Sequence, residues 1–441
     1  MGERSVDITT ELKKFQGTKE EQILQIHLKK TIILKKFYLN LVIQSCNVCK
    51  PVPFTNADVV LLPFYEQRQQ IYEYSEEETD QQIIRFENLL NMELIQKLTA
   101  VCAAPDSSVD AAPEECKSSV LCLLKFLRDI EHHQKALSGL RESGADEAKL
   151  TAVIGHHFFS QLIPGKNYEI DKGFKNIPNE CPCQLKDCKQ RIQTGCTTLG
   201  SDETWHGYVD IFLNQTVAVS VIGSSSLSGN QNSDDDDDTD DETNEIPGPS
   251  SPKQLRMHGD ETEKRREHSA SKQLCRASSK TRKRSSKTTL LHFNVIDQII
   301  AEAITNAFTQ VNRNKALSGW LIPTFGCTLD HIVVFLYDPK NDVFLQLIEQ
   351  LPLWQKTNIL SVTTVVQIWM LLNFTVFMRK NIADEYRFNS SNFHCLAGKL
   401  LKEYWNLEAG KTFGIGLNYN DFYSEKVLQT LLLHGKEVSK Q

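Results

Sequence analysis

The feature that most constrains the fold is a long charged segment, roughly residues 224–287, in a chain of 441 residues. Residues 233–245 carry nine acids and no base, and residues 253–287 carry twelve Lys or Arg against four Asp or Glu. Neither half has enough apolar residues to offset the entropy of ordering the chain. The sequence therefore predicts a disordered linker that interrupts a folded unit.

The pattern of apolar residues on either side of this linker predicts an α+β fold. Helical spacing is found in residues 20–45, 80–101 and 118–140, and again in 295–311 after the linker. Short β-branched and aromatic runs with turn residues between them predict two hairpins, 208–222 and 331–347. The predicted segments are a helical N-terminal region (1–110), the first part of an α/β core (111–223), the linker (224–287), and the second part of the core with C-terminal helices (288–441).

Residues 1–30 contain no charged start followed by an apolar run and a cleavage site, so the sequence gives no secretory signal. An intracellular chain keeps its cysteines reduced, and we expect no structural disulfides among the twelve. The 22 residues between Lys356 and Arg379 carry no charge, but eight of them are Thr, Asn, Ser or Gln. This stretch predicts a buried core helix and no membrane contact.

One short motif suggests a chemistry. Residues 203–213 read Glu-Thr-Trp-His-Gly-Tyr-Val-Asp-Ile-Phe-Leu, so a Gly-x-x-Asp with Asp210 opens a strand and a second strand follows at once. This arrangement resembles the PD-(D/E)XK, or restriction-endonuclease-like, nuclease superfamily, over about residues 155–347. The resemblance implies that Asp210 is a magnesium ligand, that a Glu-x-Lys or Asp-x-Lys follows on the next strand, and that Gln298 is an inward-facing glutamine on the next helix.

The sequence departs from that superfamily at the second ligand. Residues 217–222 read Val-Ala-Val-Ser-Val-Ile and offer neither the acid nor the lysine. Asp338-Pro339-Lys340 fits the letters but lies in a proline-containing turn, and Glu147-Ala148-Lys149 lies upstream of Asp210. A single carboxylate holds magnesium weakly, which favours a catalytically degenerate member.

Alternatives to this site remain open. Asp210 could be a solvent-facing strand or turn residue. Gln298 lies on a polar helix face with Asn294, Glu302 and Thr305, and such a face is commonly solvated.

The densest cluster of soft metal ligands is Cys181, Cys183, Cys188 and Cys196, with His206 ten residues later. Tetrahedral zinc takes four thiolate or imidazole ligands, so these four thiols are candidate zinc ligands, with free thiols on a loop as the alternative. Cys46-Asn47-Val48-Cys49 lacks a partner pair and predicts ordinary burial. The histidine pairs at 132–133 and 156–157 have no nucleophile and acid arranged with them, which indicates a structural role.

The basic half of the linker contains two clusters about a dozen residues apart, Lys264, Arg265 and Arg266 followed by Arg282, Lys283 and Arg284. This spacing is typical of a bipartite nuclear import signal, and the same side chains could contact phosphates. The neighbouring acidic half could fold back and screen them.

The sequence thus predicts a nuclear, catalytically degenerate nuclease-fold protein that binds nucleic acid or another protein. An active magnesium-dependent nuclease and a protein-interaction scaffold are the alternatives. The cofactor stays open: magnesium if the chain is an active nuclease, zinc if the cysteines bind a metal.

Overall fold

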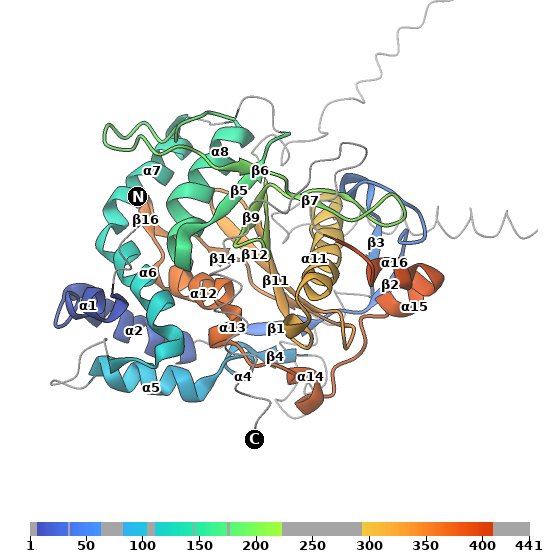
Figure 1. Ribbon diagram of the computed structural model, residues 1–441, viewed down its shortest axis with the longest axis horizontal. Helices are drawn as coiled ribbons and strands as arrows, with labels where there is room; N and C mark the ends of the chain where they lie inside the picture. Colours follow the sequence, from blue (N-terminus) through green and yellow to red (C-terminus); the bar gives the residue numbers. More distant parts are fainter. Residues whose placement is uncertain are drawn as a thin grey trace, which may run out of the picture. The chain divides into compact units, whose positions relative to one another are not determined.

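The computed structural model describes residues 7–33, 36–62, 83–103, 111–143, 146–173, 177–222 and 293–408. The predicted linker, with its acidic and basic halves, lies outside the described residues. The chain before it and the chain after it belong to one compact unit (Figure 1).

A ten-stranded mixed sheet forms the centre of this unit, in the order β4-β1-β13-β12-β11-β10-β9-β5-β6, with β14 paired to β12. The strands are β1 (Phe37–Asn40), β4 (Ile83–Arg85), β5 (Tyr168–Asp171), β6 (Thr194–Gly195), β9 (Ile211–Leu213), β10 (Val217–Val221), β11 (Ile322–Cys327), β12 (His331–Asp338), β13 (Val343–Leu347) and β14 (Leu351–Pro352). β10 and β11 are parallel neighbours, with Val219 opposite Phe325, although the linker separates them in sequence. The α+β class is therefore confirmed.

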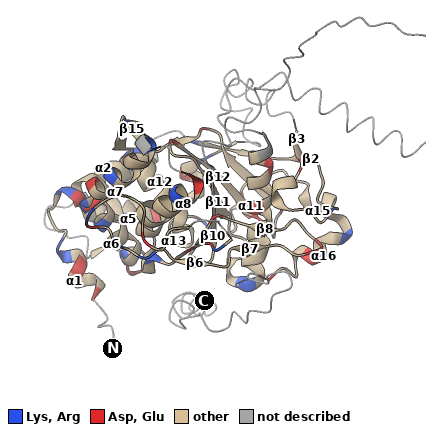
Figure 2. Cartoon of the chain, turned by 90° about the horizontal axis from the view of Figure 1, so that it is seen from above, with Lys and Arg blue, Asp and Glu red and all other residues tan. Residues whose placement is uncertain are grey.

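Helices cover both faces of the sheet. They are α1 (Ile8–Lys13), α2 (Lys19–Ile33), α4 (Phe86–Leu89), α5 (Met92–Ala103), α6 (Lys117–Arg128), α7 (Ile130–Ser143), α8 (Glu147–Ile154), α11 (Phe293–Arg313), α12 (Val362–Leu372), α13 (Phe374–Phe377), α14 (Ile382–Glu385), α15 (Phe393–Ala397) and α16 (Leu401–Tyr404). In Figures 1 and 2 α11 lies on one side of the central strands, and α6, α7, α8 and α12 lie on the other. The unit therefore has three layers, with the sheet in the middle.

Both predicted hairpins are present. β9 and β10 are antiparallel, and Asn214 and Gln215 turn the chain between them with φ of 46° and 53°. β12 and β13 are joined by a turn in which the carboxylate of Asp338 accepts hydrogen bonds from Lys340 N (2.9 Å) and Asn341 Nδ2 (2.7 Å). The positive φ values of Asn214 and Gln215 suit the right-handed twist of β9 and β10, the two strands that this turn joins.

The prediction of one continuous helix was wrong for each of three long segments. Residues 20–45 were expected to be one helix, but α2 ends at Ile33 and β1 follows, because residues 37–40 pair with β13 and β4. Residues 80–101 contain β4, α4 and α5, with a break before Asn91, whose side chain caps Leu94 N at 3.2 Å. Residues 118–140 are divided at Asp129 into α6 and α7.

Three smaller two-stranded sheets surround the core. They pair β2 (Ile43–Cys46) with β3 (Val59–Leu61), β7 (Thr198–Leu199) with β8 (Gly207–Tyr208), and β15 (Trp354–Lys356) with β16 (Ile359–Leu360). The strand expected over residues 208–213 is therefore two strands, β8 and β9, which pair with different partners.

The charge-free stretch forms α12, in which Val365, Val366, Ile368 and Trp369 are completely buried. Within the described part of the chain, no helix is both long and apolar enough to cross a membrane. The expectation of a buried core helix is confirmed, because α12 packs against α2 and α13.

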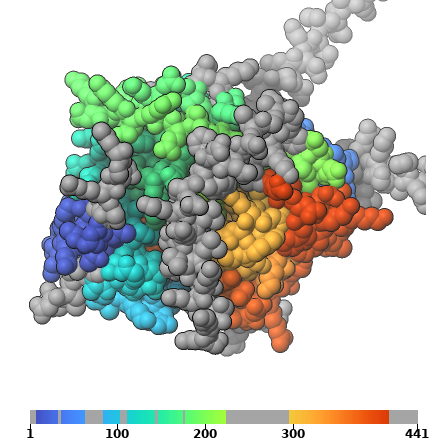
Figure 3. Space-filling view, viewed as in Figure 1, coloured from blue at the N-terminus to red at the C-terminus, as the bar shows by residue number. Residues whose placement is uncertain are grey.

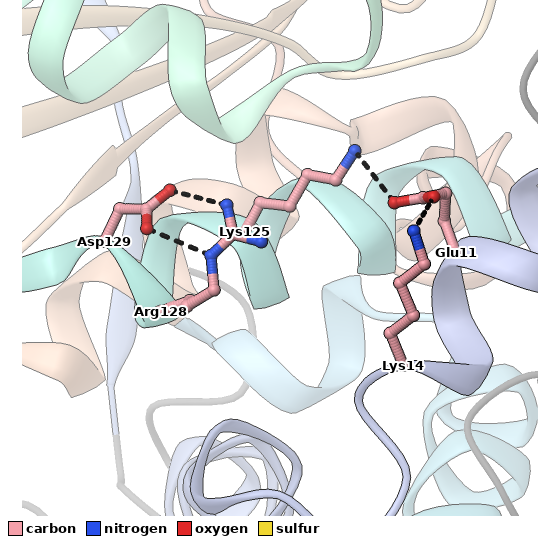
Figure 4. Close-up of polar contacts among 5 residues, drawn as sticks. All are labelled: Glu11, Lys14, Lys125, Arg128 and Asp129. Atoms are coloured by element: carbon pink, nitrogen blue, oxygen red, sulfur yellow. Dashed lines mark hydrogen bonds and ion pairs between the residues drawn. The ribbon is translucent and has the colours of Figure 1, made fainter.

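An ion pair between Glu11 and Lys125 joins the outer helices α1 and α6, and local ion pairs lie beside it (Figure 4). Glu11 forms ion pairs with Lys14 and, at 3.9 Å, with Lys125. Arg128 binds Asp129 through Nε at 3.0 Å and Nη2 at 2.8 Å. These side chains are at least partly exposed to solvent, so the pairs contribute little to stability.

Candidate functional site

Asp210 lies between β8 and β9, at the edge of the hairpin that runs into the linker. Its carboxylate accepts a hydrogen bond from the backbone N–H of Val221 at 2.6 Å, and its carbonyl accepts one from Asp171 N at 3.1 Å. The side chain therefore takes the place that a strand carbonyl would occupy beside Val221. This contact ties Asp210 to the end of β10.

A second carboxylate reaches this place from α11. Glu302 is completely buried, and one of its oxygens accepts a hydrogen bond from the hydroxyl of Ser220 on β10. Its other oxygen accepts one from Gln298 Nε2 at 2.8 Å. Val219 lies opposite Ile211 in the register of β9 and β10, so the next residue, Ser220, comes beside Asp210.

The polar face of α11 is therefore buried and not solvated. Glu302, Thr305 and Asn306 are all completely buried, and Asn306 Nδ2 donates to the carbonyl of Thr216 at 3.1 Å. This face contacts the β9–β10 hairpin, which explains why a core helix carries polar residues at helical spacing. The side chain of Asn294 lies outside the described residues.

Both carboxyl groups favour the protonated form. Burial raises the pKa of Asp210 well above its ordinary value, and the nearby charge of Glu302 raises it further, against the opposing hydrogen bond from Val221. Burial also raises the pKa of Glu302, to about 7, against the hydrogen bonds from Ser220 and Gln298. The other charged groups that most affect the pKa of Asp210 are Glu147 and Asp171, which are acids as well.

The lysine that the nuclease resemblance requires is missing from the expected strand. Ser220 and Ile222 stand at the end of β10, and Ile222 is buried. Asp338 binds the residues of its own turn between β12 and β13. Lys149, on α8, is about half exposed and pairs with Asp146 at 3.3 Å.

Glu147, two residues before Lys149 on α8, is one of the acids that raise the pKa of Asp210. The charged groups with the largest effect on the pKa of Asp210 in the described part of the chain are all carboxylates, and none is a Lys or Arg.

The cluster of candidate metal ligands in the structure differs from the predicted one by a single residue, because His157 takes the place of Cys196. The ligand atoms of Cys181, Cys183, Cys188 and His157 all lie within 4.8 Å of one another. His157 belongs to η4 (Gly155–Phe159), a π-helical turn that follows α8, and its Nε2 lies 3.4 Å from Cys188 Sγ.

Cys196 and His206 belong to other contacts. Cys196 Sγ lies 3.2 Å from Thr198 Oγ1, and Nδ1 of His206 lies 3.0 Å from the carbonyl of Thr204. None of the eleven cysteines in the described ranges is part of a disulfide, Cys46 and Cys49 included.

The four clustered side chains strongly affect one another. The hydrogen bond from the Cys181 thiol, followed by the one from His157, lowers the pKa of Cys183 well below its usual range, and the same contact between the two cysteines raises the pKa of Cys181. Burial is the main reason why the pKa of Cys188 is raised. Nearby thiols resist ionising together, so a proton or a cation must stabilise them.

The cysteine-bearing segment, residues 177–193, contains only an isolated bridge between Glu180 and Arg191 and lies at the surface. In Figure 3 the green atoms of this part of the chain extend along the top of the molecule, above the blue-green helices. The segment contacts the helical layer through the buried side chains of Cys181 and Cys183.

Comparison with known proteins gives no relative. No family model, no curated protein and no solved structure matches the chain.

Two residues of these sites, Glu302 and His157, could not be predicted as site residues from the sequence. Glu302 was visible only as one member of a polar helix face, four residues after Gln298, and nothing in the sequence placed that face against Asp210. His157 was one of two adjacent histidines, and the π-helical turn selects it because it directs one ring of the pair toward the cysteines. The basic residues Lys264, Arg265, Arg266, Arg282, Lys283 and Arg284 lie outside the described residues.

Proposed function

We propose that this chain is a catalytically degenerate nuclease-fold protein that binds nucleic acid without cleaving it. The observation that carries the proposal is the state of Asp210, whose carboxyl group is desolvated, bound by the N–H of Val221 and surrounded by acids. Magnesium requires ionised, hard oxygen ligands, and phosphodiester cleavage requires positive charge near the developing phosphate charge. This site favours neither.

The order of elements supports the nuclease resemblance. Asp210 precedes β9, β10 follows at once, and α11 brings Gln298 and Glu302 against this hairpin before β11 and β12 complete the neighbouring strands. Gln298 points toward the carboxylate of Glu302 and thus inward, as the resemblance implied for this residue.

A basic tract supports nucleic acid as the partner. Figure 2 shows basic and acidic residues interspersed on the outer helices and few charges on the central strands. The concentrated positive charge of the chain is in residues 253–287. Non-specific binding of nucleic acid comes mainly from Lys and Arg contacts with phosphates, so we assign the contact to this tract, together with nuclear import.

An active magnesium-dependent nuclease is the second candidate, and Glu302 is the observation that favours it. The sequence lacks a second carboxylate on the strand after Asp210, whereas the fold brings one to Ser220 from α11. Two carboxylates are enough to hold a divalent cation if both ionise. Burial raises the pKa of both carboxyl groups, and the acids near Asp210 raise its pKa further, which favours the non-cleaving alternative.

A protein-interaction scaffold is less well supported. The large apolar side chains that are exposed in the described part of the chain are Ile8, Ile26, Leu62, Tyr208 and Ile359. These five side chains belong to five different segments of the chain, whereas a docking surface is a contiguous apolar patch.

The proposal is tested by fluorescence anisotropy of labelled single- and double-stranded DNA and RNA with the purified full chain. We expect salt-sensitive binding that is weakened when the six residues of the two basic clusters are replaced by alanine. Absence of binding to all four nucleic acids would overturn the proposal and favour a protein partner.

A further inference from the structure

We propose that Cys181, Cys183, Cys188 and His157 form a structural zinc site that fixes the cysteine-bearing segment, residues 177–193, to the helical layer. The four ligand atoms lie within 4.8 Å of one another. Zinc holds thiolate sulfur at about 2.3 Å and imidazole nitrogen at about 2.0–2.1 Å, so tetrahedral ligands lie roughly 3.5–3.8 Å apart. The distance of 3.4 Å between His157 Nε2 and Cys188 Sγ fits this geometry.

The chemistry of the ligands selects the metal. Three sulfurs and one imidazole nitrogen are soft or borderline donors, which suit zinc and do not suit magnesium or calcium. Four protein ligands fill a tetrahedral ion completely and leave no open position for a substrate. The site is therefore structural, and it is separate in role from the Asp210 and Glu302 pair.

Backbone N–H groups are directed at the three sulfurs. The N–H groups of Leu185 and Gln190 donate hydrogen bonds to Cys183 and Cys188, and the N–H of Cys183 donates one to Cys181. Amide donors stabilise the negative charge on sulfur that metal binding requires. When zinc binds, the protons of the thiols pass to solvent.

The second ring nitrogen of His157 fixes its orientation. Nδ1 of His157 lies 3.2 Å from Nδ1 of His133 on α7, and only one of two facing nitrogens can carry a proton. If His157 keeps its proton on Nδ1 and donates it to His133, then Nε2 presents a lone pair to the cysteines. Metal-binding histidines commonly donate their other N–H to a nearby acceptor in this way.

The segment needs such a fixation because it has little regular structure of its own. Backbone hydrogen bonds from Cys181 N to Gln190 O (2.9 Å) and from Ile192 N to Asn179 O (3.0 Å) join its two ends, and Cys188 N donates to Leu185 O at 3.0 Å. A metal that links a short irregular segment to a helix contributes its binding free energy to folding. The cysteines and His157 come from parts of the chain about 24 residues or more apart, so the ion closes a substantial loop.

The test is elemental analysis of the full chain purified from zinc-supplemented medium, together with cobalt substitution. We expect one zinc per chain, and a cobalt form with thiolate charge-transfer and tetrahedral d–d absorption bands. Cys183→Ser is expected to lose the metal, whereas Cys196→Ser, a matched change of another buried cysteine close in sequence, is expected to keep it. Equal loss in both variants, iron in place of zinc, or no bound metal would each overturn the proposal.

A second measurement keeps the test valid if Cys183→Ser fails to fold. Zinc is removed from the wild-type chain with a thiol-directed mercurial and a chelator, and limited proteolysis is compared before and after. We expect metal removal to open new cleavage sites within residues 177–193 first, with cleavage blocked again when zinc is restored. Identical digestion of both forms would contradict a fixation of this segment by metal.

Discussion

Nδ1 of His133 lies 3.2 Å from Nδ1 of His157, between α7 and the π-helical turn η4. His133 is buried and stacks on Phe126, with ring centroids 5.0 Å apart. Burial, followed by the charge of His157, lowers the pKa of His133 to about 3, so this ring is neutral near pH 7 and can accept a hydrogen bond. It can therefore hold His157 in the orientation that a metal ligand needs.

His133→Phe is expected to weaken zinc binding by about 10- to 100-fold, because the acceptor for His157 is lost while the ring shape is kept. The measurement is a competition titration with a zinc chelator, read beside the absorption bands of the cobalt form. His132→Phe is the control, since the neighbouring ring is exposed. A purely structural role for His133 would lower thermal stability and leave the zinc affinity and the cobalt spectrum unchanged.

Glu302 makes the stability of the fold depend on pH. Burial raises its pKa from 4.5 to about 7 in the folded state, so the stability contributed by the protonated form is fully present below about pH 4.5 and is lost as the pH rises through 7. We expect the free energy of unfolding of the wild type to fall over this window by up to about 3 kcal/mol relative to Glu302→Gln. Urea unfolding at several pH values measures this difference.

The amide of the Glu302→Gln variant can still bind Ser220 but cannot ionise. The control is Glu93→Gln, an exposed change on α5 that is expected to leave the pH dependence of the wild type in place. Parallel pH profiles for wild type and Glu302→Gln would show that the buried carboxyl group is not the cause.

Asp210 has a structural role that can be separated from any catalytic one. Asp210→Ala leaves the N–H of Val221 without its acceptor and is expected to cost about 1–3 kcal/mol of stability. Asp210→Asn keeps an acceptor oxygen there and is expected to cost much less. Chemical denaturation of the two variants decides this, and equal losses would mean that the hydrogen bond is not the stabilising interaction.

We expect the basic clusters to set the salt dependence of nucleic-acid binding. Each phosphate contact contributes about 0.7–0.9 to the slope of log affinity against log salt concentration. Replacement of Lys264, Arg265, Arg266, Arg282, Lys283 and Arg284 by alanine is expected to reduce this slope by up to about 4 to 5. Anisotropy titrations over a range of salt concentrations measure it, and an unchanged slope would place the phosphate contacts elsewhere.

A deletion tests the role of the acidic half of the linker. If residues 234–242 screen the basic clusters, their deletion is expected to tighten binding at low salt and to have little effect at high salt. An affinity that is unchanged by the deletion at every salt concentration would exclude screening.

The sequence predicted the elements whose pattern is local. α11, α12 and the two hairpins follow from helical spacing, from buried β-branched runs and from the turn residues Asn214 and Gln215. Residues 37–46 show what local pattern misses, because they form strands only through pairing with β13, β4 and β3. Long-range pairing of this kind leaves little trace in a single sequence.

The candidate sites were only partly predicted, because some of their residues come together through the fold and not through sequence spacing. Cys181, Cys183 and Cys188 are close in sequence and close in space, whereas His157 joins them only because η4 and the segment 177–193 lie side by side in the fold. Glu302 joins Ser220 across 82 residues that include the linker, so no spacing rule could connect them.

The most direct test of the proposed function is incubation of the purified full chain with single- and double-stranded DNA and RNA in the presence of magnesium or manganese. The Asp210→Asn variant is assayed in parallel. We predict binding without cleavage, identical for wild type and variant, because burial and the neighbouring acids raise the pKa of Asp210 well above its ordinary value and disfavour the ionised carboxylate that magnesium requires. Cleavage that requires the metal and disappears in Asp210→Asn would contradict it and establish an active nuclease in which Glu302 supplies the second carboxylate.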